Sequence, residues 1–88
     1  MDTMKHIDQE IRINARKLSS PGPRLMAENI LGDERPAAVR IIVSNDEAAR
    51  DVAAYLQKRG ADVRTDILGE DIHVIAHFAP KKAARKHK

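Results

Sequence analysis

The segment Ser20-Pro21-Gly22-Pro23 is the part of this 88-residue chain whose residue types and spacing could support chemistry. Proline is favoured at the first position of a helix, so the residue before Pro21 is expected at the helix N-cap, near the positive end of the helix dipole. A cysteine at that position would have a lowered pKa and would react as a thiolate. The chain contains no cysteine, and Ser20 occupies the position instead. Because a serine hydroxyl without a neighbouring base is a weak nucleophile, we expect Ser20 to act as an N-cap.

Hydrolysis and anion binding at this segment find little support in the sequence. No Gly-x-Ser-x-Gly turn surrounds Ser20, and no histidine lies near it in the chain. The two prolines remove N–H groups from the first turn, which leaves mainly Gly22 to donate to an anion. Asp46 and Asp51 are interpreted as charges at a helix start and on a solvent-facing side. We therefore predict that the chain is not an enzyme.

A metal site is also disfavoured, although two histidines share one side of a predicted strand. His73 and His77 are four positions apart, which places them about 13 Å from each other along a strand. That separation is too large for two imidazoles to bind one ion at bond lengths of about 2.1 Å. We predict no metal and no cofactor.

Composition limits the class of protein. Without cysteine the chain has no disulfides, and it has neither an apolar stretch of about 20 residues nor a secretory leader, so we expect a cytoplasmic protein without a membrane span. Five of the 16 basic residues fall in the last eight positions, and the remaining 11 are outnumbered by 13 acidic residues. We predict a flexible lead over residues 1–9, one domain over 10–79 and a disordered basic tail over 80–88.

Hydrophobic periodicity divides the domain into six elements. We expect strands, in chain order, at Glu10–Asn14, Ala38–Val43, Ala61–Leu68 and Ile72–Phe78, the last two joined by a turn at Gly69-Glu70. The first helix runs from the proline segment to about Leu31. The second begins at a capping box of Ser44 and Glu47 and ends near Arg59.

Apolar positions predict which side of each helix is buried. The first helix groups Leu25, Met26, Asn29 and Ile30 on one side, and the second has a stripe of Ala49, Val52, Ala53 and Leu56. The order βαβαββ predicts a two-layer α/β (α+β) sandwich: a four-stranded mixed sheet with two helices on one face.

The other face of the sheet is expected to be open. It would carry Arg12, Arg40, Ile42, Arg64, His73, Ile75 and His77. Arginines and a basic tail suggest weak nucleic-acid binding, but base stacking needs aromatic side chains, and Tyr55 and Phe78 fit the core better. Ile42 and Ile75 form a small apolar spot, compatible with a partner or dimer contact.

These residues resemble the TusA/SirA-like family of small sulfur-carrier proteins. The first family motif is roughly Leu-Asp-x-Arg-Gly-Leu-x-Cys-Pro-x-Pro, and the chain has Ile13-Asn14-Ala15-Arg16-Lys17-Leu18-Ser19-Ser20-Pro21-Gly22-Pro23. The second-helix pattern is matched at the same spacing by Asp46-Glu47, Asp51-Val52-Ala53, Tyr55 and Gly60. The resemblance covers residues 10–79 and implies the fold described above, which is also that of the C-terminal domain of translation initiation factor three.

In the family, the motif cysteine accepts a persulfide and passes it on. Ser20 stands at that position and cannot hold a persulfide, while Lys17 replaces the motif glycine. Our first hypothesis is a non-catalytic, partner-binding or regulatory protein. It would dock a protein partner, with sulfur-relay proteins as the candidates that the resemblance implies. The docking surface, which we name the helix entrance, consists of Arg16, Ser20, Pro21, Gly22, Pro23 and Met26. The alternatives are a sulfur carrier whose cysteine at position 20 has been exchanged for serine, and weak nucleic-acid binding through the tail and the open sheet face.

Overall fold

The computed structural model describes residues 10–78 and contains the six predicted elements in the predicted order. They are β1 (Glu10–Asn14), α1 (Gly22–Leu31), β2 (Ala38–Val43), α2 (Asp46–Lys58), β3 (Ala61–Leu68) and β4 (Asp71–Phe78). The predicted flexible lead (1–9) and basic tail (80–88) lie outside the described residues, as does position 79 at the end of the predicted domain. No helix of the described part is long and apolar enough to cross a membrane.

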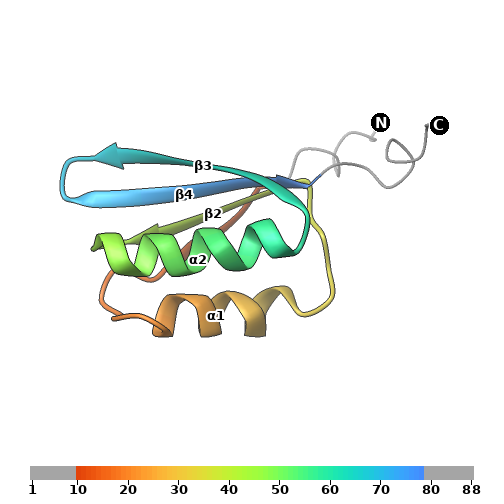
Figure 1. Ribbon diagram of the computed structural model, residues 1–88, viewed down its shortest axis with the longest axis horizontal. Coiled ribbons are helices and arrows are strands. Elements are labelled where there is room, and N and C mark those ends of the chain that lie inside the picture. Colours follow the sequence, from red (N-terminus) through yellow and green to blue (C-terminus); the bar gives the residue numbers. More distant parts are fainter. Residues whose placement is uncertain (1–9, 79–88) are drawn as a thin grey trace, which may run out of the picture.

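The four strands form one mixed sheet in the order β1-β2-β4-β3. β1 and β2 are parallel because α1 connects them as a crossover, whereas β4 is antiparallel to both of its neighbours. Figure 1 shows α1 and α2 side by side on the same side of the sheet. The predicted two-layer sandwich is therefore confirmed.

The core lies between the helices and one face of the sheet. Strand residues alternate, so every second side chain points toward the helices. The fully buried side chains of β2 are Val39, Ile41 and Val43, as predicted, and Val52 and Leu56 of α2 pack against them. The α2 stripe is confirmed, with Ala48 as an additional buried member.

The prediction for the buried side of α1 was wrong in part. The buried residues are Pro23, Ala27 and Leu31, which follow one another at intervals of four. Of the residues that the sequence groups on one side, Leu25 and Ile30 are 50% and 53% exposed, whereas Met26 is partly buried and packs against the core. The buried side thus begins with the small residues Pro23 and Ala27, whereas the bulkier Leu25 and Ile30 lie outside the core.

Both predicted helix caps differ from the structure. The N-cap of α2 is Asn45, whose side-chain oxygen accepts from the N–H of Ala48 at 2.8 Å. Ser44 instead donates its hydroxyl proton to the carbonyl oxygen of Arg16. The N-cap of α1 is Pro21, one residue after the predicted Ser20, and no side chain bonds to this helix end. Adjacent residues can exchange roles in this way because a cap depends on the local backbone angles as well as on the residue type.

Candidate functional site

The loop between β1 and α1 is fixed to the neighbouring strand and to the start of α2. The N–H of Ala15 donates to the carbonyl of Ile42 at 2.8 Å, and the hydroxyl of Ser44 bonds to Arg16. Gly22 approaches Leu18 so closely that an added Cβ would lie 3.1 Å from the Leu18 Cβ. The loop therefore has a defined position at the beginning of α1.

Ser20 contacts a carboxylate of the other helix. Its hydroxyl donates to Oδ2 of Asp51 over 3.4 Å, which is a long hydrogen bond. Nε of Arg24 lies 3.2 Å from Oδ1 and 3.0 Å from Oδ2 of the same carboxylate. Asp51 therefore joins the loop before α1 to the first turn of that helix. Our interpretation of Asp51 as a solvent-facing charge was wrong, because its carboxylate contacts both Ser20 and Arg24.

Arg24 continues this cluster along α1. One of its terminal nitrogens lies 2.6 Å from Oε2 of Glu28, one helical turn away. The hydrogen bond that Arg24 donates to Glu28, followed by that to Asp51, raises the pKa of Arg24, so its guanidinium stays charged. With one cation and two carboxylates, the cluster of Arg24, Glu28 and Asp51 carries a net negative charge when all three groups are ionised.

The start of α1 offers little to an anion. Pro23 has no N–H, the N–H of Gly22 donates to the carbonyl of Ser19 at 2.7 Å, and that of Leu25 donates to Pro21 at 3.0 Å. The expectation that Gly22 is the main free donor was therefore wrong. The backbone N–H of Arg24 is the remaining donor of the first turn. One N–H group is too few for the cradle of amides that binds phosphate at helix ends.

The residues of the helix entrance differ in how accessible they are. Arg16 and Pro21 are exposed, whereas Ser20, Gly22 and Met26 are partly buried. Arg16 also forms an ion pair with Asp71 at the start of β4, at 3.1 Å. Pro23 is buried, so it supports the surface from beneath and does not form part of it.

Sequence reasoning missed the cluster of Arg24, Glu28 and Asp51. The spacing of Arg24 and Glu28 is a signal for an ion pair within a helix. The contact of Ser20 with Asp51 spans 31 positions, and only the packing of α1 beside α2 creates it.

No histidine lies beside Ser20 in the described part of the chain. Its two histidines, His73 and His77, belong to the open face of the sheet, away from the helices. Among residues 10–78, no group of three or more side chains is arranged to hold a metal ion. Ser20 is thus placed as a hydrogen-bond donor to Asp51, over a long contact of 3.4 Å, and the same carboxylate is paired with Arg24.

The open face carries ion pairs that reduce its free positive charge. Glu10 lies 3.0 Å from Arg12 and 3.3 Å from Arg40. The hydrogen bond from Arg12 lowers the pKa of Glu10, burial opposes the shift, and Arg40 adds to the lowering. Arg40 also lies 2.9 Å from Nδ1 of His73. Nucleic-acid binding by this face stays a prediction.

The apolar spot expected on the open face is smaller than predicted. Ile75 is only 3% exposed and lies outside the helix-side core. Arg40 and Arg64 flank it on the two neighbouring strands, where their aliphatic stems can cover apolar surface. Ile42 is partly buried.

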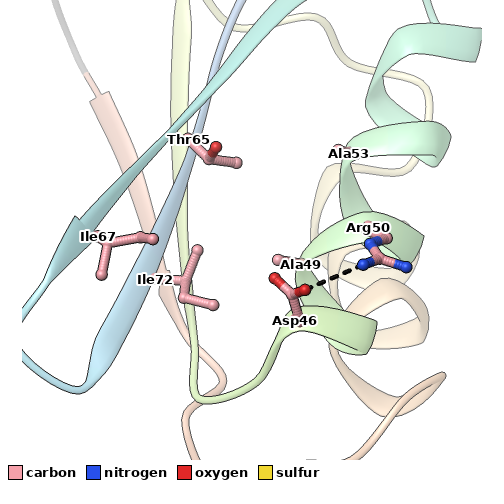
Figure 2. A pocket seen from close by; sticks show the side chains of 7 residues that line it. All are labelled: Asp46, Ala49, Arg50, Ala53, Thr65, Ile67 and Ile72. Atoms are coloured by element: carbon pink, nitrogen blue, oxygen red, sulfur yellow. Dashed lines mark hydrogen bonds and ion pairs between the residues drawn. The ribbon is translucent and has the colours of Figure 1, made fainter.

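A shallow pocket lies between α2 and the β3–β4 hairpin, with a volume of about 260 Å³ (Figure 2). Its walls are mostly apolar, and the ion pair of Arg50 with Asp46, at 3.1 Å, lies at one side. The lining residues are Asp46, Ala49, Arg50, Ala53, Thr65, Ile67 and Ile72. None of these residues belongs to the helix entrance.

Comparison with known proteins supports the fold. The sequence matches no model of a protein family, and no curated protein matches it. Among solved structures, the chain is similar to a SirA-like protein from Desulfitobacterium hafniense, with a TM-score of 0.68 and 20% sequence identity. The similarity covers 80% of this chain and 99% of that protein. The chain therefore has a SirA-like fold, as the sequence resemblance predicted.

Proposed function

We propose that this chain is a non-catalytic protein of SirA-like fold that binds a protein partner through the helix entrance and carries no sulfur. The proposal rests on one observation. At the position where the resemblance expects a cysteine, the hydroxyl of Ser20 donates to the carboxylate of Asp51.

The surroundings of Ser20 argue against anion chemistry at this position. A hydroxyl cannot hold a persulfide, and the carboxylate of Asp51 disfavours any negative charge beside it. The N–H groups that could offset such a charge are largely used within the loop and the helix. The nearby guanidinium of Arg24 is directed to the carboxylates of Asp51 and Glu28. A neutral hydrogen-bonding side chain therefore suits this position better than a thiolate.

Docking of a preformed surface is the proposed mechanism. The loop is held by backbone hydrogen bonds and by the contact of Ser20 with Asp51, so a partner would meet an ordered surface. Arg16 supplies a positive charge and Pro21 an exposed apolar ring. By resemblance, sulfur-relay proteins of the cytoplasm are the first partners to test, with the chain as a regulator or scaffold.

Co-purification with sulfur-relay enzymes tests the proposal. We expect the wild-type chain to be retained and Ser20→Arg to lose retention, because the larger charged side chain would protrude from the helix entrance. Gln57→Arg adds the same side chain at an exposed position of α2 and serves as the control. Absence of retention of the wild type, or equal retention of all three proteins, would contradict the proposal.

The alternative of a sulfur carrier with an exchanged cysteine has its own support. The spacing of Arg16, Leu18, Pro21 and Pro23 matches the family motif, and the fold agrees. This alternative predicts that Ser20→Cys gains a persulfide when incubated with a cysteine desulfurase and cysteine. Intact mass spectrometry would detect the added sulfur, and our proposal predicts that none is added.

A further inference from the structure

The outer edge of β3 is the longest unpaired strand edge in the described part of the chain. β3 pairs along its full length with β4, and Figure 1 shows no other element beside its outer edge. An exposed strand edge presents free N–H and C=O groups that can pair with another strand. The pairing with β4 has no bulge, so the edge is regular.

The hydrogen bonds of β4 establish which residues of β3 face outward with their backbone groups. The N–H of Phe78 donates to Ala37, on the β2 side, at 3.1 Å, and so points away from its β3 partner Ala61. Hydrogen-bonded and non-hydrogen-bonded pairs alternate along antiparallel strands. The backbone groups of Ala61, Val63, Thr65 and Ile67 are therefore directed toward the free edge.

Apolar side chains lie next to these free backbone groups. Ile67 is 74% exposed, the most exposed of the large apolar residues described, and it lines the pocket beside α2 (Figure 2). Leu68 is 53% exposed. A partner strand at this edge would cover both backbone and apolar surface.

When β3 is paired antiparallel with β3 of a second copy, one register brings opposite charges together. When the two-fold axis passes through Thr65, Arg64 of each copy lies opposite Asp66 of the other. Val63 then lies opposite Ile67, on the helix side of the sheet. The Arg64–Asp66 pairs are non-hydrogen-bonded pairs, in which facing side chains are closest.

Neighbouring registers are less favourable. An axis at Arg64 places the two Arg64 side chains against each other and Asp62 against Asp66, and an axis at Asp66 opposes two carboxylates. An axis at Val63 pairs Asp62 with Arg64 but leaves Ile67 beyond the paired segment. Among the registers centred on residues 63 to 66, only the one at Thr65 combines opposite charges with coverage of Ile67.

We propose that β3 is a self-association edge: it pairs with β3 of a second copy about a two-fold axis at Thr65. The two four-stranded sheets become one continuous sheet, and both helix layers lie on the same side of it. Such an interface is isologous and closed, so assembly stops at the dimer. The helix entrance is formed by other elements and is not part of this edge.

Cysteine crosslinking tests the register on the full chain, which has no cysteine of its own. Facing residues of a hydrogen-bonded pair have Cα atoms about 5.5 Å apart, within the range of a disulfide. We expect Thr65→Cys to form a covalent dimer under mild oxidation. Asp62→Cys is the control on the same strand, because its two thiols would be about 20 Å apart. Equal crosslinking of both variants, or none at Thr65→Cys, would overturn the proposal.

Charge exchange provides a second measurement. Arg64→Asp and Asp66→Arg each place like charges together, and each is expected to weaken self-association about tenfold in sedimentation equilibrium. A mixture of the two variants restores opposite charges at both pairs, so the heterodimer should form as well as the wild-type dimer. A wild-type chain that stays monomeric would contradict the proposal, and coverage of the edge by the chain's own terminal segments would give this result. A mixture that associates no better than the single variants would also contradict it.

Discussion

The two helices lie side by side on the same face of the sheet, yet they begin in different ways. α2 starts with local signals, namely the Asn45 side chain on the N–H of Ala48 and two acidic residues, Asp46 and Glu47, in the first turn. α1 starts at Pro21 without a side-chain cap and without an acidic first turn. Its start is held by contacts with α2, in which Ser20 and Arg24 reach Asp51.

This difference indicates where the chain departs from an ordinary helix start. The beginning of α2 depends on residues within four positions of one another, so it would form in many proteins. The beginning of α1 depends on the packed fold. A surface ordered by long-range contacts suits docking, which is the role we propose for the helix entrance.

The largest expected effect concerns the buried side of α1. Leu31→Ala should lower the free energy of unfolding by about 2 kcal/mol or more, because it leaves a cavity in the core. Ile30→Ala should change it by less than about 0.5 kcal/mol, since half of that side chain is exposed. Urea unfolding of both variants measures the difference. Equal losses of unfolding free energy in the two variants would contradict the buried side of α1 described above.

The second expected effect compares the two helix starts directly. Asn45→Ala should cost about 1 kcal/mol, the usual effect of losing an N-cap. Ser20→Ala should cost about 0.5 kcal/mol, because its hydrogen bond is long and caps no helix. Urea unfolding of the two variants ranks them. A larger loss for Ser20→Ala would show that our assignment of the caps is wrong.

A smaller effect is expected from the ion pair between the helices. A double-mutant cycle of Arg24→Ala and Asp51→Ala should give a favourable coupling that is smaller than the loss in Asn45→Ala, because exposed pairs contribute little. The coupling should decrease at high salt, since screening acts on partly exposed charges. A coupling free energy of zero at low salt would mean that the ion pair of Arg24 with Asp51 does not help to hold α1.

The smallest expected effect is the contribution of Glu10, on the open face, to the pH dependence of stability. The pKa of Glu10 is lowered in the folded protein from its ordinary value of 4.5. The resulting stabilisation is present above pH 4.5 and is lost as the pH falls through the lowered pKa. Glu10→Gln should therefore flatten part of the decline in stability below pH 4.5. An unchanged acid profile would mean that the ion pairs of Glu10 do not persist in solution.

The sequence predicts the elements and their order because each carries a local signal. Alternation marks the strands, as in Val39, Ile41 and Val43, and the stripe of α2 has strong periodicity. The side of α1 is not predicted, because its buried face begins with the small residues Pro23 and Ala27 while its bulkier Leu25 and Ile30 remain exposed. Size and apolarity alone point to the wrong side of this helix.

The candidate site is only partly predictable for the same reason. The motif spacing locates Ser20 at the start of α1, but its partner Asp51 lies 31 positions away on another helix. A pattern within α2 cannot reveal whether Asp51 faces solvent or α1. The choice between Ser44 and Asn45 as a cap depends on backbone angles, which adjacent polar residues do not specify.

The reactivity of a thiol placed at position 20 tests the account most directly. Ser20→Cys creates the single thiol of the chain, and its rate of alkylation as a function of pH gives the thiol pKa. The neighbouring carboxylate of Asp51 and the scarcity of free N–H groups predict a pKa at or above the ordinary value of about 8.5, with no persulfide formed. A pKa below about 7.5, together with persulfide formation by a desulfurase, would contradict the account and favour the sulfur carrier.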